Sequence, residues 1–131
     1  MARRRTARTV LALRVLRHYA VVRRELWRRR PLATIVARAP RATSPYRDNP
    51  LRLSRAVSRV LLHGHESQVR CIHRALVLHR LLVEQGTCAV VVIGLPPDAP
   101  GVRTHAWVEV GGHDVGPLPG RAGHEPMATY R

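Results

Sequence analysis

The sequence predicts an α+β fold in which helices come first and a small antiparallel sheet follows. The first part of the 131-residue chain carries apolar residues at helical spacing, and the part after Gly86 changes to short apolar or alternating runs. A Gly-Gly pair between two of these runs is typical of a tight hairpin turn. The length allows one compact domain, which we divide into a basic helical region over residues 1–48 and a core over residues 49–131.

The N-terminal region predicts one long basic amphipathic helix. After a basic tail over residues 1–5, apolar side chains recur from Thr6 to Arg29, and Pro31 should end the helix near Arg30. The apolar positions are Ala12, Val15, Leu16, Tyr19, Val22 and Leu26. Several arginines fall on another face, so the helix either packs one stripe against the core or also contacts a membrane surface or nucleic acid.

A short helical piece and a loop are expected over residues 32–48, before the next helix. Asn49 is a candidate cap for a helix that begins at Pro50, because proline fits the first helical position. The apolar face of that helix would consist of Leu53, Ala56, Val57, Val60 and Leu61.

The following helix places a cysteine in its first turn. Ser67 is the candidate N-cap, the helix runs to about Glu84, and Gly86 stands where helices commonly end. Cys71, Ala75, Leu78 and Leu82 line one apolar stripe. The helix dipole and free backbone N–H groups favour a thiolate at this end, whereas a buried cysteine also serves as a small apolar side chain. From this helix alone, Cys71 can be either a catalytic nucleophile or a small side chain of the core.

The C-terminal part predicts strands. The run CAVVVIGL has the length of a buried strand, and VRTHAWVEV-GG-HDVG indicates two strands joined by the Gly-Gly turn. Alternation along HAWVEV puts His105, Trp107 and Glu109 on one face. Residues 117–131 are rich in Pro and Gly and are expected to be mostly irregular.

Composition narrows the compartment and the kinds of partner. The formal charge is +15, and all 23 basic residues are arginine, which favours nucleic acid, an anionic membrane or an acidic peptide as partners. The absence of lysine also fits a coding bias toward arginine on a solvated surface. Two cysteines are too few for a disulfide framework, and neither a secretory signal nor a membrane span is visible, so we expect free thiols in a reducing cytoplasm.

A cysteine on a helix and a histidine on a later strand suit a hydrolase with a thiol nucleophile. The imidazole of His105 would take the proton of Cys71 and return it to the leaving group. A histidine among core residues is nevertheless more often structural. His63, His65 and Cys71 are residue types that bind zinc, but their spacing matches no compact zinc pattern, so we expect no metal and no cofactor.

The residues around this pair resemble the transglutaminase-like leader peptidase of lasso-peptide biosynthesis. The resemblance covers about residues 50–118 and rests on CIHRALVLHRLLVEQGTCAVVVIGL followed by HAWVEVGG. It implies a transglutaminase-like, papain-like core in which Cys71 and His105 are the catalytic pair. It also implies a cysteine protease that cuts the leader from a ribosomally made precursor, so that a cyclase can close a macrolactam ring.

The same resemblance implies partners. In the family, either a separate small protein or a fused N-terminal domain recognises the leader. The residues before Cys71 read as helices rather than as a strand-rich recognition domain, so we expect a stand-alone peptidase with a separate leader-recognition protein. The other expected partners are the lasso precursor peptide and the macrolactam-forming cyclase. We expect no nucleic acid, and the basic N-terminal helix is the expected place of any peripheral membrane contact.

The third catalytic residue departs from the family pattern. The acid expected about a dozen residues after His105 would fall at Pro117, and Asp114 is the nearest acid. With a two-residue Gly turn, His105 faces Leu118, and Asp114 stands roughly 13 Å away at about 3.3 Å per residue, unless the register slips or bulges. Asp114 is therefore the tentative acid, and a pair oriented by a backbone carbonyl or an acid such as Glu125 are the alternatives.

Two other functions remain compatible with the sequence. A transglutaminase-like acyl transferase would use the same pair with an amine as acceptor in place of water. A small basic protein that binds nucleic acid or a membrane surface would keep both the thiol and the imidazole as structural groups.

Overall fold

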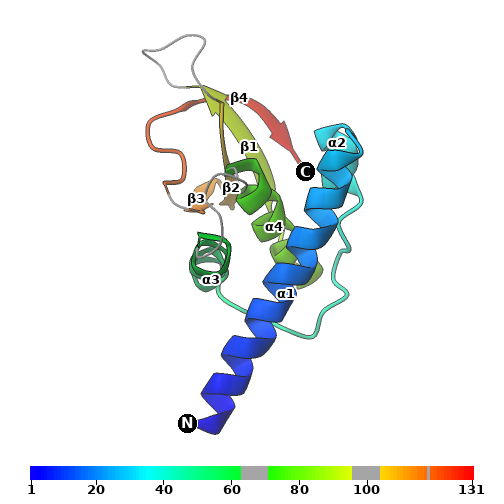
Figure 1. Ribbon diagram of the computed structural model, residues 1–131. Coiled ribbons are helices and arrows are strands. Elements are labelled where there is room, and N and C mark those ends of the chain that lie inside the picture. Colours follow the sequence, from blue (N-terminus) through cyan, green and yellow to red (C-terminus); the bar gives the residue numbers. More distant parts are fainter. Residues whose placement is uncertain (63–70, 96–103, 118) are drawn as a thin grey trace.

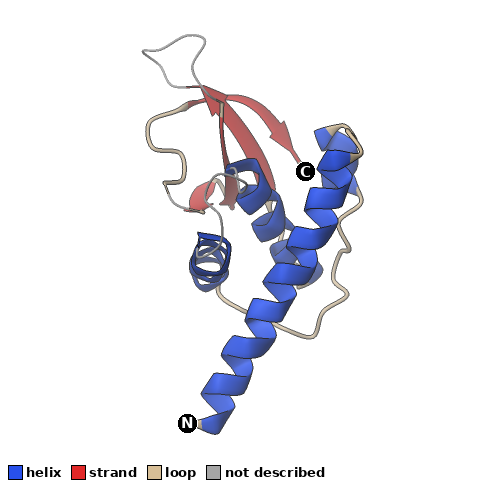
Figure 2. Cartoon of the chain, viewed as in Figure 1, coloured by secondary structure: helices blue, strands red, loops and turns tan. Residues whose placement is uncertain are grey.

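The computed structural model shows helices followed by a small antiparallel sheet, which confirms the predicted α+β fold (Figure 1). The structure describes residues 1–62, 71–95, 104–117 and 119–131. Within these residues there are four helices and one four-stranded sheet, and the helices pack beside the sheet (Figure 2).

Helix α1 spans Ala2–Trp27 and differs from the sequence prediction at both ends. The prediction of a separate basic tail over residues 1–5 is wrong, because these residues from Ala2 onward are helical. At the other end, the helix stops at Trp27, slightly before the expected end near Arg30. Alanine and arginine are strong helix formers, and no glycine or proline interrupts these residues.

The buried face of α1 also differs from the predicted stripe. It consists of Leu11, Val15, His18, Val22 and Glu25, whereas Leu16 is exposed. Two polar residues are buried here because each finds a charged partner. His18 contacts Glu84 of α4, and Glu25 pairs with Arg30.

The second and third helices follow the prediction closely. Helix α2 spans Leu32–Ala37 and helix α3 spans Pro50–Leu62. The backbone N–H of Leu51 donates to Oδ1 of Asn49 at 2.9 Å, so Asn49 caps α3 as expected. The buried positions Leu53, Val57 and Leu61 confirm its predicted apolar face.

Helix α4 spans Cys71–Glu84 and lies between the other helices and the sheet. Every residue from Ala75 to Val83 is buried, so α4 forms the centre of the core. The chain leaves the helix through Gly86, whose φ of +87° favours glycine, and the Gly86 N–H donates to the carbonyl oxygen of Val83 at 3.0 Å. The predicted cap Ser67 lies outside the described residues.

The strand order in the sheet is β3-β2-β1-β4, and the paired strands are antiparallel. Strand bounds are β1 Val90–Leu95, β2 His105–Val110, β3 His113–Gly116 and β4 Glu125–Tyr130. The Gly-Gly hairpin is confirmed, because Val110 pairs with His113 and Glu109 pairs with Asp114.

Strand β4 was not predicted, although the rest of the described part of residues 117–131 is irregular as expected. It pairs with β1 at the edge of the sheet, with Pro126 opposite Gly94 and a register shift after Ile93. Proline is tolerated at a sheet edge because no neighbour requires its missing N–H. Most side chains of β4 are exposed, so the strand has no apolar pattern that a sequence could reveal.

One apolar core unites the helices with one face of the sheet. It includes Val15 of α1, Leu53 of α3 and Leu78 of α4, together with Ala106 and Val108 of β2. Residues before and after position 48 both contribute to this core. The division of the chain after residue 48 stays a prediction. None of the helices in the described ranges has the length and apolar character needed to cross a bilayer.

Candidate active site

The thiol of Cys71 lies beside the start of β2. Cys71 is the first described residue of α4, it is partly buried, and it forms no disulfide. Its Sγ donates a long hydrogen bond of 3.9 Å to the carbonyl oxygen of Thr104, the residue just before His105. The packing of α4 against β2 therefore brings the predicted nucleophile to the backbone next to the predicted base.

The imidazole of His105 is held among other rings and has one unpartnered nitrogen. Its centroid lies 6.3 Å from that of Trp107 in a stacked arrangement and 5.0 Å from that of His124. Nε2 is buried and has no hydrogen-bond partner among the residues that the structure describes. The structure thus brings Cys71 and His105 to neighbouring positions without a hydrogen bond between thiol and ring.

The surroundings of His105 favour its neutral form. Burial is the main reason that the pKa of His105 lies below its usual 6.5, and the charges of His124 and Arg74 lower it further. A hydrogen bond with the backbone of Gly120 and, to a smaller extent, the charge of Asp114 act in the opposite direction. Because Nε2 has no described partner, the ring atom that bonds to the Gly120 backbone is Nδ1. Nε2 is then the nitrogen that can accept a proton.

Asp114 organises a neighbouring loop and does not hydrogen-bond to His105 in the described part of the chain. Its carboxylate accepts bonds from the backbone N–H groups of Gly116 at 2.8 Å and Arg121 at 2.7 Å. A Cβ at Gly120 would collide with the same carboxylate. Asp114 therefore fixes the loop whose Gly120 backbone contacts the imidazole.

The register around Asp114 explains this arrangement. A bulge between Val108 and Glu109 puts Gly116 opposite Val108, one residue beyond regular pairing. This shift moves the loop but leaves Asp114 opposite Glu109. The other predicted acid, Glu125, lies exposed at the start of β4. Leu118, which was expected to face His105, lies outside the described residues.

Two residues of the site could not be found from the sequence. His124 covers the His105 ring, and its own Nδ1 lies 2.8 Å from the carbonyl oxygen of Arg121. Gly120 supplies the backbone contact to His105. Both belong to the segment that the sequence predicts to be irregular, and neither stands in a periodic pattern that would indicate its position.

Trp107 supports the site from within the sheet, as core packing predicts. It is fully buried, and its indole N–H donates to Oε1 of Glu109 at 3.2 Å. A Cβ at Gly94, the partner of His105 in β1, would come within 2.6 Å of the indole. Glycine at this position therefore makes room for the ring on which His105 stacks.

The described residues contain no group of His, Cys, Asp and Glu side chains that could hold a metal ion. His63 and His65, the other members of the zinc pattern considered from the sequence, lie outside those residues.

Comparison with protein families matches residues 6–129 to the transglutaminase-like superfamily. The matched region extends from α1 into β4 and includes both Cys71 and His105. Members of this superfamily are generally cysteine proteases or acyltransferases. No curated protein and no solved structure matches the chain. Because the family match covers nearly the whole sequence, this chain belongs to the transglutaminase-like superfamily.

Proposed function

We propose that this protein is a cysteine peptidase that removes the leader from a lasso-peptide precursor through a thioester. The observation that supports the chemistry best is the Cys71 thiol against the carbonyl just before His105, in a chain of the transglutaminase-like superfamily. The lasso precursor as substrate rests on the resemblance of residues 50–118.

The first chemical step forms the thioester. The thiol of Cys71 leaves the Thr104 carbonyl and gives its proton to Nε2 of His105, and the sulfur attacks the carbonyl carbon at the leader–core junction. The C–N bond then breaks, and His105 passes the proton to the departing amine of the core peptide. The unpartnered Nε2 and the lowered pKa of His105 suit this step, because the base must begin neutral.

The second step releases the leader. His105 accepts a proton from water as the water oxygen attacks the thioester carbon. The C–S bond then breaks, His105 returns the proton to the sulfur to restore the Cys71 thiol, and the leader acid ionises to its carboxylate. Backbone N–H groups in the first turn of α4 are the expected donors to the oxyanion in both steps. The positive end of the helix dipole acts in the same direction.

The orienting group in this proposal is the backbone of Gly120 rather than a carboxylate. Gly120 holds Nδ1 of the imidazole, and Asp114 acts through the loop as a positioning residue. The partners proposed for the reaction are the precursor peptide, a separate leader-recognition protein and the cyclase that uses the freed core.

The test is incubation of the purified chain with a precursor peptide, with and without the leader-recognition protein, followed by mass spectrometry. We expect a leader with a free carboxylate and a core with a free N-terminus. Cys71→Ala should abolish this cleavage, while Cys88→Ala, which removes the exposed cysteine, should keep it. A product with a new amide link would instead indicate acyl transfer, and an intact precursor together with salt-sensitive DNA or vesicle binding would favour a binding protein.

A further inference from the structure

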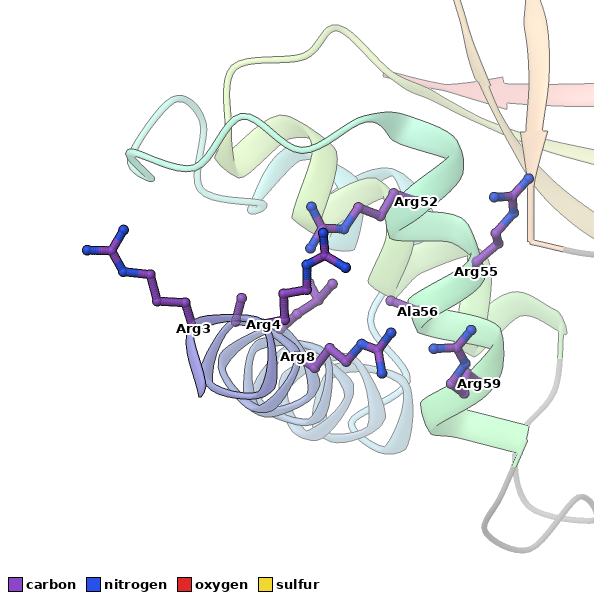
Figure 3. A pocket seen from close by; sticks show the side chains of 9 residues that line it. Arg3, Arg4, Arg8, Arg52, Arg55, Ala56 and Arg59 are labelled. Carbon is purple, nitrogen blue, oxygen red and sulfur yellow. The ribbon is translucent and has the colours of Figure 1, made fainter. Parts of the chain in front are cut away.

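A groove with arginine walls lies between α1 and α3, away from the Cys71–His105 pair (Figure 3). Its volume is about 510 Å³. Three of the arginines come from the first turns of α1 and three from α3, namely Arg3, Arg4, Arg8, Arg52, Arg55 and Arg59. None of the residues that line it belongs to α4 or to the sheet.

The positive charge of this groove is almost entirely unneutralised. Within the described residues, only Arg52 of the six has a salt bridge, to Asp48 at 3.3 Å. The other five also make no side-chain hydrogen bond in that part of the chain. Lack of a partner is not special to the groove, since Arg17 and Arg23 of α1 also have no salt bridge within the described residues, whereas the partly buried Arg14 pairs with Asp48 at 3.2 Å. What distinguishes the arginine groove is that six arginines from two helices line one cavity.

Like charges in the groove also repel each other along each helix. Arg4 and Arg8 stand four residues apart on α1, and Arg55 and Arg59 do so on α3, which is a destabilising arrangement. No acidic residue lies in the first turn of α1 to offset the positive end of its dipole. A bound anion would reduce the repulsion between these arginines and would also compensate the positive end of the α1 dipole. The groove is therefore electrostatically suited to binding an anion.

The groove has apolar surface beside its charges. Leu11 and Ala56 contribute to its lining. A second cavity of about 580 Å³ shares Leu11, Arg3 and Arg52 with the groove. It continues along α1 to Val10 and the ring of Tyr46, beside the ion pair of Arg14 and Asp48. The two cavities thus form one surface with a cationic part and an apolar part.

We infer that this surface binds an acidic peptide segment whose carboxylates are followed by apolar side chains. Guanidinium groups bind carboxylates through paired, charge-assisted hydrogen bonds, and the apolar part offers contacts for the neighbouring residues of a peptide. Single-stranded nucleic acid fits less well, because its bases stack on aromatic rings, and the one ring in the described lining of this surface, Tyr46, already has the Arg14 guanidinium 4.3 Å from its centroid.

The test measures fluorescence anisotropy of a labelled peptide with six glutamates followed by three leucines, near physiological ionic strength. The protein carries Cys71→Ala, so that failure of the proposed peptidase activity and failure of this binding are distinguishable. The groove variant combines Arg8→Gln, Arg55→Gln and Arg59→Gln. The control variant removes the same charge at exposed arginines elsewhere, with Arg23→Gln, Arg28→Gln and Arg131→Gln.

We expect the groove variant to weaken binding by about thirtyfold or more and the control variant by about threefold or less. Replacing the glutamates of the probe by glutamine should abolish binding, and replacing its leucines by serine should weaken it. Circular dichroism should show that both variants stay folded. Equal losses in the two variants, or equal binding of the glutamine probe, would overturn the inference. So would tighter, groove-dependent binding of single-stranded DNA or of anionic vesicles.

Discussion

The two ends of α4 hold polar side chains in opposite states of pairing. At the C-terminal end, Nε2 of His18 donates to Glu84 at 2.8 Å, and Nε of Arg80 donates to Nδ1 of His18 at 3.3 Å. At the N-terminal end, Cys71 makes one long hydrogen bond to a carbonyl, and Nε2 of His105 has no described partner. The same helix thus carries a satisfied polar network at one end and an unsatisfied pair at the other.

This difference separates groups that hold the fold from groups that are free to react. Buried polar atoms are normally paired, because an unpaired one loses its hydrogen bonds to water without compensation. Burial lowers the pKa of His18, but Glu84 and Arg80 still occupy both of its ring nitrogens. The pKa of His105 is also lowered by burial, yet its Nε2 stays available as a proton acceptor.

The largest effect should follow from removing the unsatisfied imidazole. We predict that His105→Ala lowers kcat/KM for precursor cleavage by at least about a hundredfold, because the thiol loses its base. The free energy of unfolding should change little, since the removed ring leaves few bonds unmade. Cleavage kinetics and urea unfolding measure the two quantities. A variant that retains a tenth or more of the activity would remove His105 from the mechanism.

The opposite pattern is expected at the paired end of α4. Glu84→Gln should lower the free energy of unfolding by about 2 kcal/mol, because His18 and Arg14 lose their charged partner in a largely buried position. The activity of the folded fraction should stay close to that of the unchanged protein. Urea unfolding together with cleavage assays at low temperature tests this. If Glu84→Gln lost activity without losing stability, the separation between the two ends would fail.

Asp114→Asn distinguishes a positioning residue from a direct orienting acid. The asparagine keeps one acceptor oxygen for two backbone N–H groups, so the loop carrying Gly120 should loosen, and kcat should fall by about tenfold. If the carboxylate were bonded directly to the imidazole, its replacement would lower kcat by up to about ten-thousandfold. A loss as large as that of His105→Ala would therefore place Asp114 in direct contact with His105 in the active state.

The smallest predicted change concerns pH. The neutral form of His105 is the active one, and its pKa is lowered below 6.5, so activity should persist as the pH falls below that value. His124→Gln removes one charge that lowers this pKa, so the pKa should rise and activity should be lost at a higher pH. The pH profile of kcat/KM, or an NMR titration of the His105 ring, measures the shift. A shift toward lower pH would show that His124 acts in another way.

Much of the fold could be predicted because its signals are local. The Asn49-Pro50 start of α3, the Gly86 end of α4 and the Gly-Gly hairpin each depend on neighbouring residues. The buried His18 and Glu25 could not be predicted, since their pairing depends on partners that only the folded chain brings near.

The candidate site divides in the same way. The positions of Cys71 and His105 at the starts of a helix and a strand follow from the local pattern. The bulge after Val108 and the contact of Gly120 with His105 arise from tertiary packing, so neither could be predicted from the sequence.

The rate at which iodoacetamide alkylates Cys71 tests the central claim most directly, with the exposed Cys88 as an internal reference. We predict that Cys71 reacts at least about tenfold faster than Cys88 at neutral pH, although it is less exposed, because a nearby imidazole accepts its proton. His105→Ala should abolish this advantage. A Cys71 that reacts no faster than Cys88, or equally fast without His105, would contradict the proposed pair.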